Sequence, residues 1–112
     1  MDPLHLLQET KIKELVEQMR PPVHIRNQLD IGYSYEKQNL EIYESRPRWN
    51  NKSEVDHHPF AKARFISSKN IWKIYWRRAS GKWQIYEPHP EVNNIEGFFK
   101  VINEDKLGAF LG

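Results

Sequence analysis

The sequence of 112 residues contains no cysteine, which excludes disulfides, thiol catalysis and zinc sites with cysteine ligands. It also has no apolar run that approaches the roughly 20 residues needed to span a bilayer, so we expect a cytoplasmic protein without a membrane partner. No GxGxxG motif, phosphate-binding loop or nucleophile elbow is present, and we expect neither a cofactor nor a metal. The length fits a single domain over residues 1–112.

Acidic residues are missing from one long segment of the chain. Between Phe60 and Tyr86 there are seven Lys or Arg residues and seven aromatic residues but no Asp or Glu, whereas ten acidic residues precede this segment and five follow it. The formal net charge of +2 therefore conceals a strongly basic stretch. Its local field, more than the net charge, decides which partners the surface attracts.

Two segments have the apolar spacing of amphipathic helices. The first covers residues 3–20 and must end before Pro21 and Pro22, because proline cannot donate the helical hydrogen bond. The second covers about residues 90–103, where apolar side chains again recur at helical spacing.

Between these segments, alternation of apolar and polar residues predicts five strands, at about residues 28–36, 40–46, 60–66, 71–77 and 83–87. Pro47 is expected to end the second strand, and the polar, turn-rich residues 48–59 predict an irregular loop. The order of helix, five strands and helix predicts an α+β fold. Its antiparallel, meander-type sheet would have the helices on one face.

Alternation also divides the last three strands into two sets of side chains. The apolar set, predicted to face the helices, is Trp72, Ile74, Trp76, Trp83 and Ile85. The opposite set, with two cations of the last hairpin, is basic and aromatic: Lys62, Arg64, Lys73, Tyr75, Arg77, Arg78, Lys82 and Tyr86. Clustered cations attract phosphates and tyrosine rings stack on bases, so this surface is a candidate site for the backbone of DNA or RNA. The alternative is an ordinary solvent-exposed sheet face, on which such residues pair across strands.

Protein interaction is a second candidate function. An exposed strand edge, or the aromatic part of the same face, would bury against another protein or against a second copy in a homodimer.

Glu44 and Arg46 share the alternation phase of Leu40, which points them toward the side of the core. Charged side chains seldom occupy such positions without partners. The simplest interpretation is a salt bridge, for example to Arg64 or Arg26, that fixes the start of the loop after Pro47.

A third candidate function is a small hydrolase or nuclease. Glu44 would act as acid or base, Arg46 would bind an oxyanion, and His57 or His58 would assist from the predicted loop. Because the histidines lack the spacing of a metal site or a catalytic motif, we expect a binding protein more than an enzyme.

Several runs together resemble one bacterial protein family. They are LEIYESRP at residues 40–47 followed by Trp49, PFAKARF at residues 59–65, WKIYWR at residues 72–77 and WQIY at residues 83–86. The chain is similar in these runs to the family called domain of unknown function 3024, and the likeness extends to residues 22–28 and 110–112. Members have an acidic residue after the arginine that corresponds to Arg77, where this chain has Arg78. The resemblance implies a small, stand-alone, cytoplasmic bacterial protein without an assigned activity.

Overall fold

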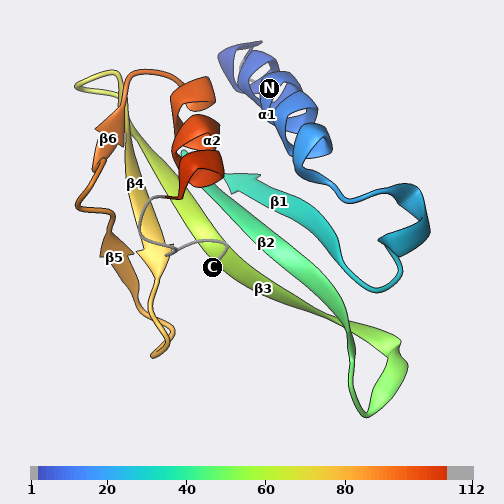
Figure 1. Ribbon diagram of the computed structural model, residues 1–112. Coiled ribbons are helices and arrows are strands. Elements are labelled where there is room, and N and C mark those ends of the chain that lie inside the picture. The colour runs from blue at the N-terminus through green and yellow to red at the C-terminus, as the bar shows by residue number, and fades with distance from the viewer. Residues whose placement is uncertain (1–2, 106–112) are drawn as a thin grey trace.

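Two helices lie on the same face of an antiparallel sheet, and the opposite face of the sheet carries neither of them (Figure 1). This computed structural model describes residues 3–105, and the side chains from Leu7 onward. The elements in chain order are α1 (Pro3–Met19), the 3-10 helix η1 (Val23–Ile25), β1 (Asp30–Glu36), β2 (Asn39–Arg48), β3 (Asn51–Ile66), β4 (Ile71–Arg77), β5 (Trp83–Ile85), β6 (Glu91–Val92) and α2 (Ile95–Glu104). The predicted α+β architecture is therefore confirmed, with one strand more than expected.

The sheet is a meander in which β1 to β5 pair in chain order. The sixth strand, β6, pairs with β4 at Trp72 and Lys73, while β5 pairs with the other end of β4, at Tyr75 to Arg77. The two short strands therefore share one edge of β4. No helix among the described residues is long and apolar enough to cross a membrane.

The core lies between the sheet and the two helices. Leu40 and Ile42 of β2 and Ile74 of β4 are fully buried, as strand alternation requires for a sheet covered on one face. Trp72 is also buried, with its ring centroid 5.0 Å from that of Phe65. The helices contribute buried residues at helical spacing: Ile12 and Val16 from α1, and Ile95, Phe98, Phe99, Val101 and Ile102 from α2. This arrangement leaves the polar side of each strand on the face without helices.

The prediction of an irregular loop at residues 48–59 is wrong. Strands β2 and β3 continue past the rest of the sheet as a two-stranded ribbon, residues 46–58, which we call the β2–β3 arm (Figure 1). Pro47 does not end β2, because β1 stops at the pair of Asp30 with Ser45 and no strand on that side needs an N–H from Pro47. Pro59 is tolerated in β3 for the same reason, since pairing with β4 begins at Ala61.

The second helix begins later than predicted, at Ile95. Residues 91–92 form β6, and Asn94 then caps the helix, because its side chain accepts a hydrogen bond of 2.8 Å from the N–H of Gly97. A Cβ at Gly97 would lie only 3.0 Å from Cβ of Val92. The glycine therefore allows the first turn of α2 to lie close to β6.

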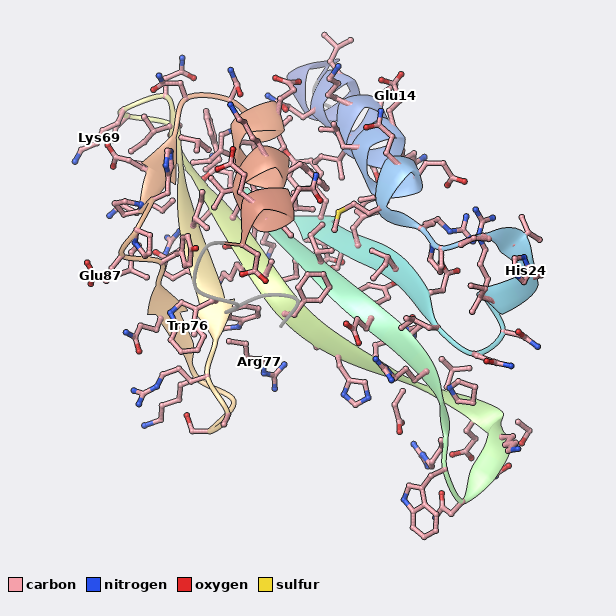
Figure 2. All side chains as sticks on the ribbon, in the orientation of Figure 1. Glu14, His24, Lys69, Trp76, Arg77 and Glu87 are labelled. Atoms are coloured by element: carbon pink, nitrogen blue, oxygen red, sulfur yellow. The ribbon has the colours of Figure 1, made fainter. Side chains whose placement is uncertain are left out.

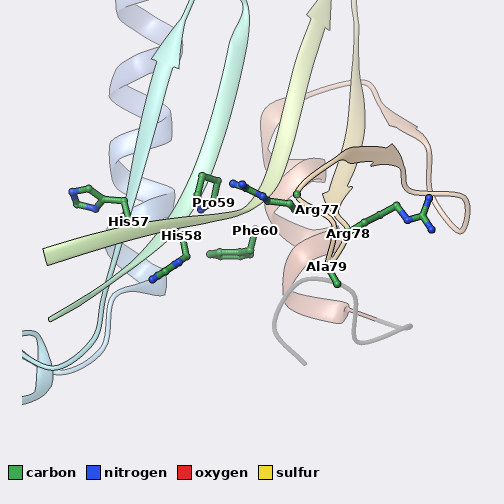
Figure 3. A pocket seen from close by; sticks show the side chains of 8 residues that line it. His57, His58, Pro59, Phe60, Arg77, Arg78 and Ala79 are labelled. Atoms are coloured by element: carbon green, nitrogen blue, oxygen red, sulfur yellow. The ribbon is translucent and has the colours of Figure 1, made fainter. Parts of the chain in front are cut away.

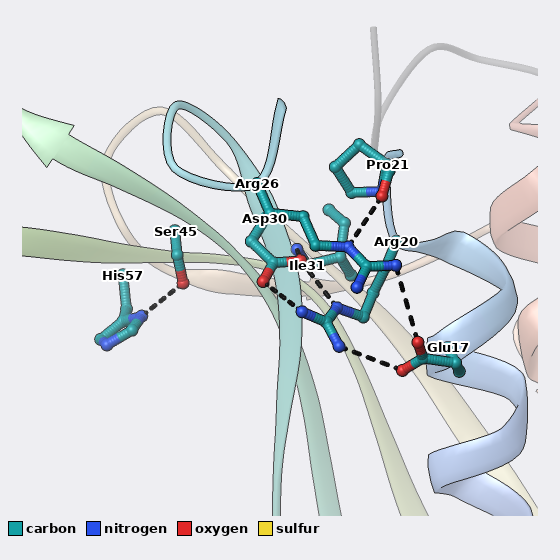
Figure 4. A network of polar contacts seen from close by, with 8 residues as sticks. All are labelled: Glu17, Arg20, Pro21, Arg26, Asp30, Ile31, Ser45 and His57. Carbon is teal, nitrogen blue, oxygen red and sulfur yellow. Dashed lines mark hydrogen bonds and ion pairs between the residues drawn. The ribbon is translucent and has the colours of Figure 1, made fainter. Parts of the chain in front are cut away.

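An ion pair joins the end of α1 to the start of β1 (Figure 4). The guanidinium of Arg20 donates two hydrogen bonds of 2.9 Å to the two carboxylate oxygens of Asp30, and a third to Glu17. The hydrogen bonds from Arg20 lower the pKa of Asp30, and those bonds raise the pKa of Arg20. This bidentate contact fixes the helix against the edge strand.

The Asp30 carboxylate should make stability depend on pH in the acid range. Its pKa is lower in the folded than in the unfolded chain, so its contribution is complete above the unfolded value of about 4 and disappears as the pH falls through the folded value. We expect Asp30→Asn to lower the urea midpoint at pH 7 and to have a progressively smaller effect as the pH falls below about 4. The exposed Glu14→Gln should leave the pH profile unchanged, and an Asp30→Asn profile parallel to that of the wild type would contradict this account.

Candidate functional site

The face without helices carries basic and aromatic side chains in directly opposed pairs. Lys62 of β3 lies opposite Tyr75 of β4, Arg64 lies opposite Lys73, and Arg77 of β4 lies opposite Trp83 of β5. Because opposed residues of antiparallel strands share a face, all six side chains lie on one surface. We call these six residues the open-face cluster.

Cation–π contacts connect members of this cluster. Nζ of Lys62 lies 5.5 Å from the ring centroid of Tyr75 and 5.7 Å from that of Trp83. Cζ of Arg77 lies 6.0 Å from the same Trp83 ring. The indole therefore reaches across β4 and has two cations over its ring, both within the range in which such attraction is effective.

The four cations of the cluster have no carboxylate partner. Within residues 7–105, neither Lys62, Arg64, Lys73 nor Arg77 has a nitrogen within 4.0 Å of an acidic oxygen. Elsewhere in this part of the chain five cations have carboxylate partners, namely Lys11, Arg20, Arg26, Arg46 and Arg48, whereas other exposed cations such as Lys13, Lys52 and Lys100 have none. The positive charge of the cluster is thus directed at solvent.

Acidic residues lie at the margins of this surface. Glu41 of β2 is opposite Lys62, and Glu91 of β6 is opposite Lys73. Neither carboxylate is within ion-pair distance of its opposed lysine. The open face is therefore basic over β3 and β4, with an acidic residue on either side, Glu41 on β2 and Glu91 on β6. Lys69, although part of the basic sequence segment, extends from the turn between β3 and β4 and not from this surface (Figure 2).

The prediction of which side chains of β5 face the helices is wrong: the two sides are reversed. This changes which residues belong to the site. Trp83 and Ile85 face the open side, and Tyr86 is only 2% exposed and belongs to the core. The five residues between β4 and β5 set a register in which odd-numbered residues oppose odd-numbered ones. The turn that does this is closed by a hydrogen bond from Arg78 N–H to the carbonyl of Lys82, with Gly81 at φ 87°. Tyr86 is therefore removed from the candidate site and Trp83 is added.

Arg78 and Lys82, the two hairpin cations, are exposed beside an open pocket of about 380 Å³. Its lining residues are His57, His58, Pro59, Phe60, Arg77, Arg78, Ala79 and Gly81. Figure 3 shows the Arg77 side chain extending toward Pro59, whereas that of Arg78 extends the opposite way. The two guanidinium groups do not converge on the pocket, so its walls are not a cage for one anion.

The structure brings three of the four candidate catalytic residues, Glu44, Arg46 and His58, to one face of the β2–β3 ribbon. Glu44 pairs with Arg46 at 3.1 Å, and not with Arg64 or Arg26, the partners that the sequence suggested. His57 Nδ1 instead lies 2.8 Å from Oγ of Ser45, a contact that nothing in the spacing of these residues had indicated (Figure 4). The second histidine, His58, is opposite Glu44 in register, without a hydrogen bond between them in the described part of the chain. Residues 57 and 58 point to opposite sides of β3, so His58 shares a face with Glu44 and Arg46 whereas His57 does not.

Substitution of Glu44 should therefore have a small effect. Because the Glu44–Arg46 pair is partly exposed, with the Arg46 side chain 55% and the Glu44 side chain 26% accessible, and joins neighbours on one strand, we expect Glu44→Gln to change the free energy of unfolding by less than about 1 kcal/mol. Thermal or urea unfolding of the variant tests this. A loss of several kcal/mol would show a structural role that these contacts do not explain.

Comparison with known protein families gave a match over nearly the whole chain. The family model described as Domain of unknown function (DUF3024) matches residues 2–112. A search of curated proteins and a search of solved structures each gave no significant match. The terminal part of the sequence resemblance, residues 110–112, lies outside the residues that the structure describes.

Proposed function

Because the chain belongs to the DUF3024 family, whose description names no activity, we propose from its own surface that it binds nucleic acid through the open-face cluster. One observation carries the proposal: four cations share a sheet face without a carboxylate partner among the described residues. A polyanion supplies the missing countercharge and gains from the release of its own bound ions.

The opposition of Arg64 and Lys73 favours this proposal over an ordinary solvent-exposed face. Cross-strand pairs in a sheet are stabilised by opposite charges and destabilised by like charges. A surface that only protects the sheet from aggregation gains nothing from placing two cations opposite each other. A surface that holds phosphates gains from every added cation, at the cost of some stability in the free protein.

The contacts would be with phosphates and therefore independent of sequence. Lysine and arginine side chains on a broad sheet face meet the backbone before they reach base edges. The hairpin cations Arg78 and Lys82 extend the positive surface past the end of β4.

Fluorescence anisotropy with labelled DNA and RNA oligonucleotides tests the proposal. We expect dissociation constants in the micromolar range at about 50 mM salt, with affinity falling steeply as salt is added. Oligonucleotides of scrambled sequence serve as matched ligands and should bind alike. The absence of binding at low salt would refute the proposal.

A second candidate function, self-association, is favoured by the β2–β3 arm. Trp49 at the tip of the arm is 90% exposed, and the β3 edge from Asn51 to Pro59 has no strand on its β4 side. Arg48 of the arm pairs with both Glu54 and Asp56, so this arginine and these two carboxylates are not available to a charged partner. Edge pairing with a second copy would use the free N–H and C=O groups. Light scattering separates the two functions: nucleic-acid binding requires only a monomer, whereas a stable dimer that Trp49→Ser dissociates would support self-association.

A further inference from the structure

We infer, on the basis of the proposed function, that the open-face cluster prefers single-stranded over double-stranded nucleic acid, with the Trp83 indole as the platform on which a base stacks. Three features of the surface lead to this preference: the position of the aromatic rings, the breadth of the sheet face, and the ion pairs that occupy the arginines of the arm.

The rings of the cluster lie among its cations. Trp83 is half-buried on the short edge strand β5, and Lys62 and Arg77 lie over its ring. A base stacked on this indole would displace both cations from the ring, and the flanking phosphates of the same strand would receive them. Stacking on aromatic side chains with cations nearby is the usual means of holding a single strand without reading its sequence. Base pairs within a duplex offer no free face for this contact.

The shape of the face disfavours the grooves of a duplex. The major groove admits a helix or a two-stranded ribbon, whereas the cluster spans β3, β4 and the edge strand β5 of a wider sheet. A duplex would therefore touch this face only through phosphates on its outer surface. The rings of Tyr75 and Trp83 would then contribute nothing to binding.

The β2–β3 arm is the one two-stranded ribbon among residues 3–105 that extends beyond the sheet. Its dimensions suit a groove, but Arg48 is committed to Glu54 and Asp56, and Arg46 to Glu44. The arm therefore presents no unpaired arginine to a phosphate backbone. We therefore do not expect the arm to bind a duplex and so offset the preference of the open-face cluster for a single strand.

The test uses the full chain with Trp49→Phe, which removes the exposed indole at the arm tip. Of the remaining tryptophans, Trp72 is buried and Trp76 packs against the core, so quenching by a bound strand reports on Trp83. The ligands are a thymidine oligomer of about 12 nucleotides, the corresponding uridine oligomer, and a DNA duplex of the same length, a size within the usual range of such sites. All titrations are made at one low salt concentration.

We expect either single strand to bind about tenfold more tightly than the duplex and to quench the tryptophan fluorescence. Adding Trp83→Phe should abolish most of the quenching while retaining binding, because a ring remains. Adding Trp83→Leu should lower single-strand affinity about tenfold and leave duplex affinity unchanged. If the leucine variant does not fold by circular dichroism, the phenylalanine variant and the quenching decide.

Equal affinities for single strand and duplex, or quenching that persists after Trp83→Phe, would overturn the preference while leaving the proposed function in place. Quenching of the unmodified chain that disappears with Trp49→Phe alone would also overturn it, since the contact would then lie on the arm. Failure of all three ligands to bind would refute the proposed function itself.

Discussion

Replacing Lys62, Lys73 and Arg77 together with glutamine should lower the affinity for a single-stranded oligonucleotide on the order of 100-fold at about 50 mM salt. These three cations lie on one face without carboxylate partners in the described chain, so each is available to a phosphate. The dependence of log affinity on log salt should lose about 2 units of slope, because a single strand releases about 0.7 counterion per contact. Anisotropy titrations at four or more salt concentrations, roughly 50 to 300 mM, would measure both quantities.

A control variant separates the surface from the net charge. Lys13 of α1, Lys52 of the arm and Lys100 of α2 are exposed, and their replacement with glutamine removes the same total charge from other surfaces. This variant should retain most of the affinity and nearly all of the salt slope. Equal losses in the two triple variants would mean that overall charge, and not the open-face cluster, attracts the ligand.

Tyr86→Ala should lower the free energy of unfolding by about 3 kcal/mol and leave the affinity of the folded protein unchanged. The sequence pattern places this tyrosine on the binding face, but its side chain is 2% exposed within the core. Tyr75→Ala should do the reverse, because Tyr75 is a half-buried ring of the open face, beside Lys62. Its removal should weaken oligonucleotide binding and cost about 1 kcal/mol of stability or less.

Urea unfolding and anisotropy, measured at a temperature where both variants are folded, would compare the two tyrosines. If Tyr86→Ala weakens binding while stability is unchanged, the assignment of faces on β5 is incorrect. If Tyr75→Ala is the more destabilising change, the open face has a structural role that its contacts do not reveal.

The helices and most of the strands could be predicted because their signals are local. Alternation over residues 71–77 separates Trp72 and Ile74 from Lys73 and Tyr75, and the structure places them on opposite faces accordingly. The same local pattern could not assign Trp83. The phase of β5 depends on the number of residues in the preceding turn, and the apolar character of Trp83 had suggested the core side instead.

The β2–β3 arm could not be predicted for a different reason. Its residues are polar and include Pro47, which usually marks the end of a strand. A two-stranded ribbon outside the sheet buries little on either side, so its sequence need not alternate between apolar and polar residues. The Ser45–His57 contact follows from this pairing and is invisible without it.

Chemical-shift mapping by NMR, with isotope-labelled protein and an unlabelled thymidine oligomer, tests the central claim most directly. We expect the largest changes at Lys62, Tyr75 and Trp83, including the indole N–H of Trp83, and little change in α1 and α2 on the opposite face of the sheet. Changes concentrated on the helices or on the arm, or no changes at saturating oligomer and low salt, would contradict the account.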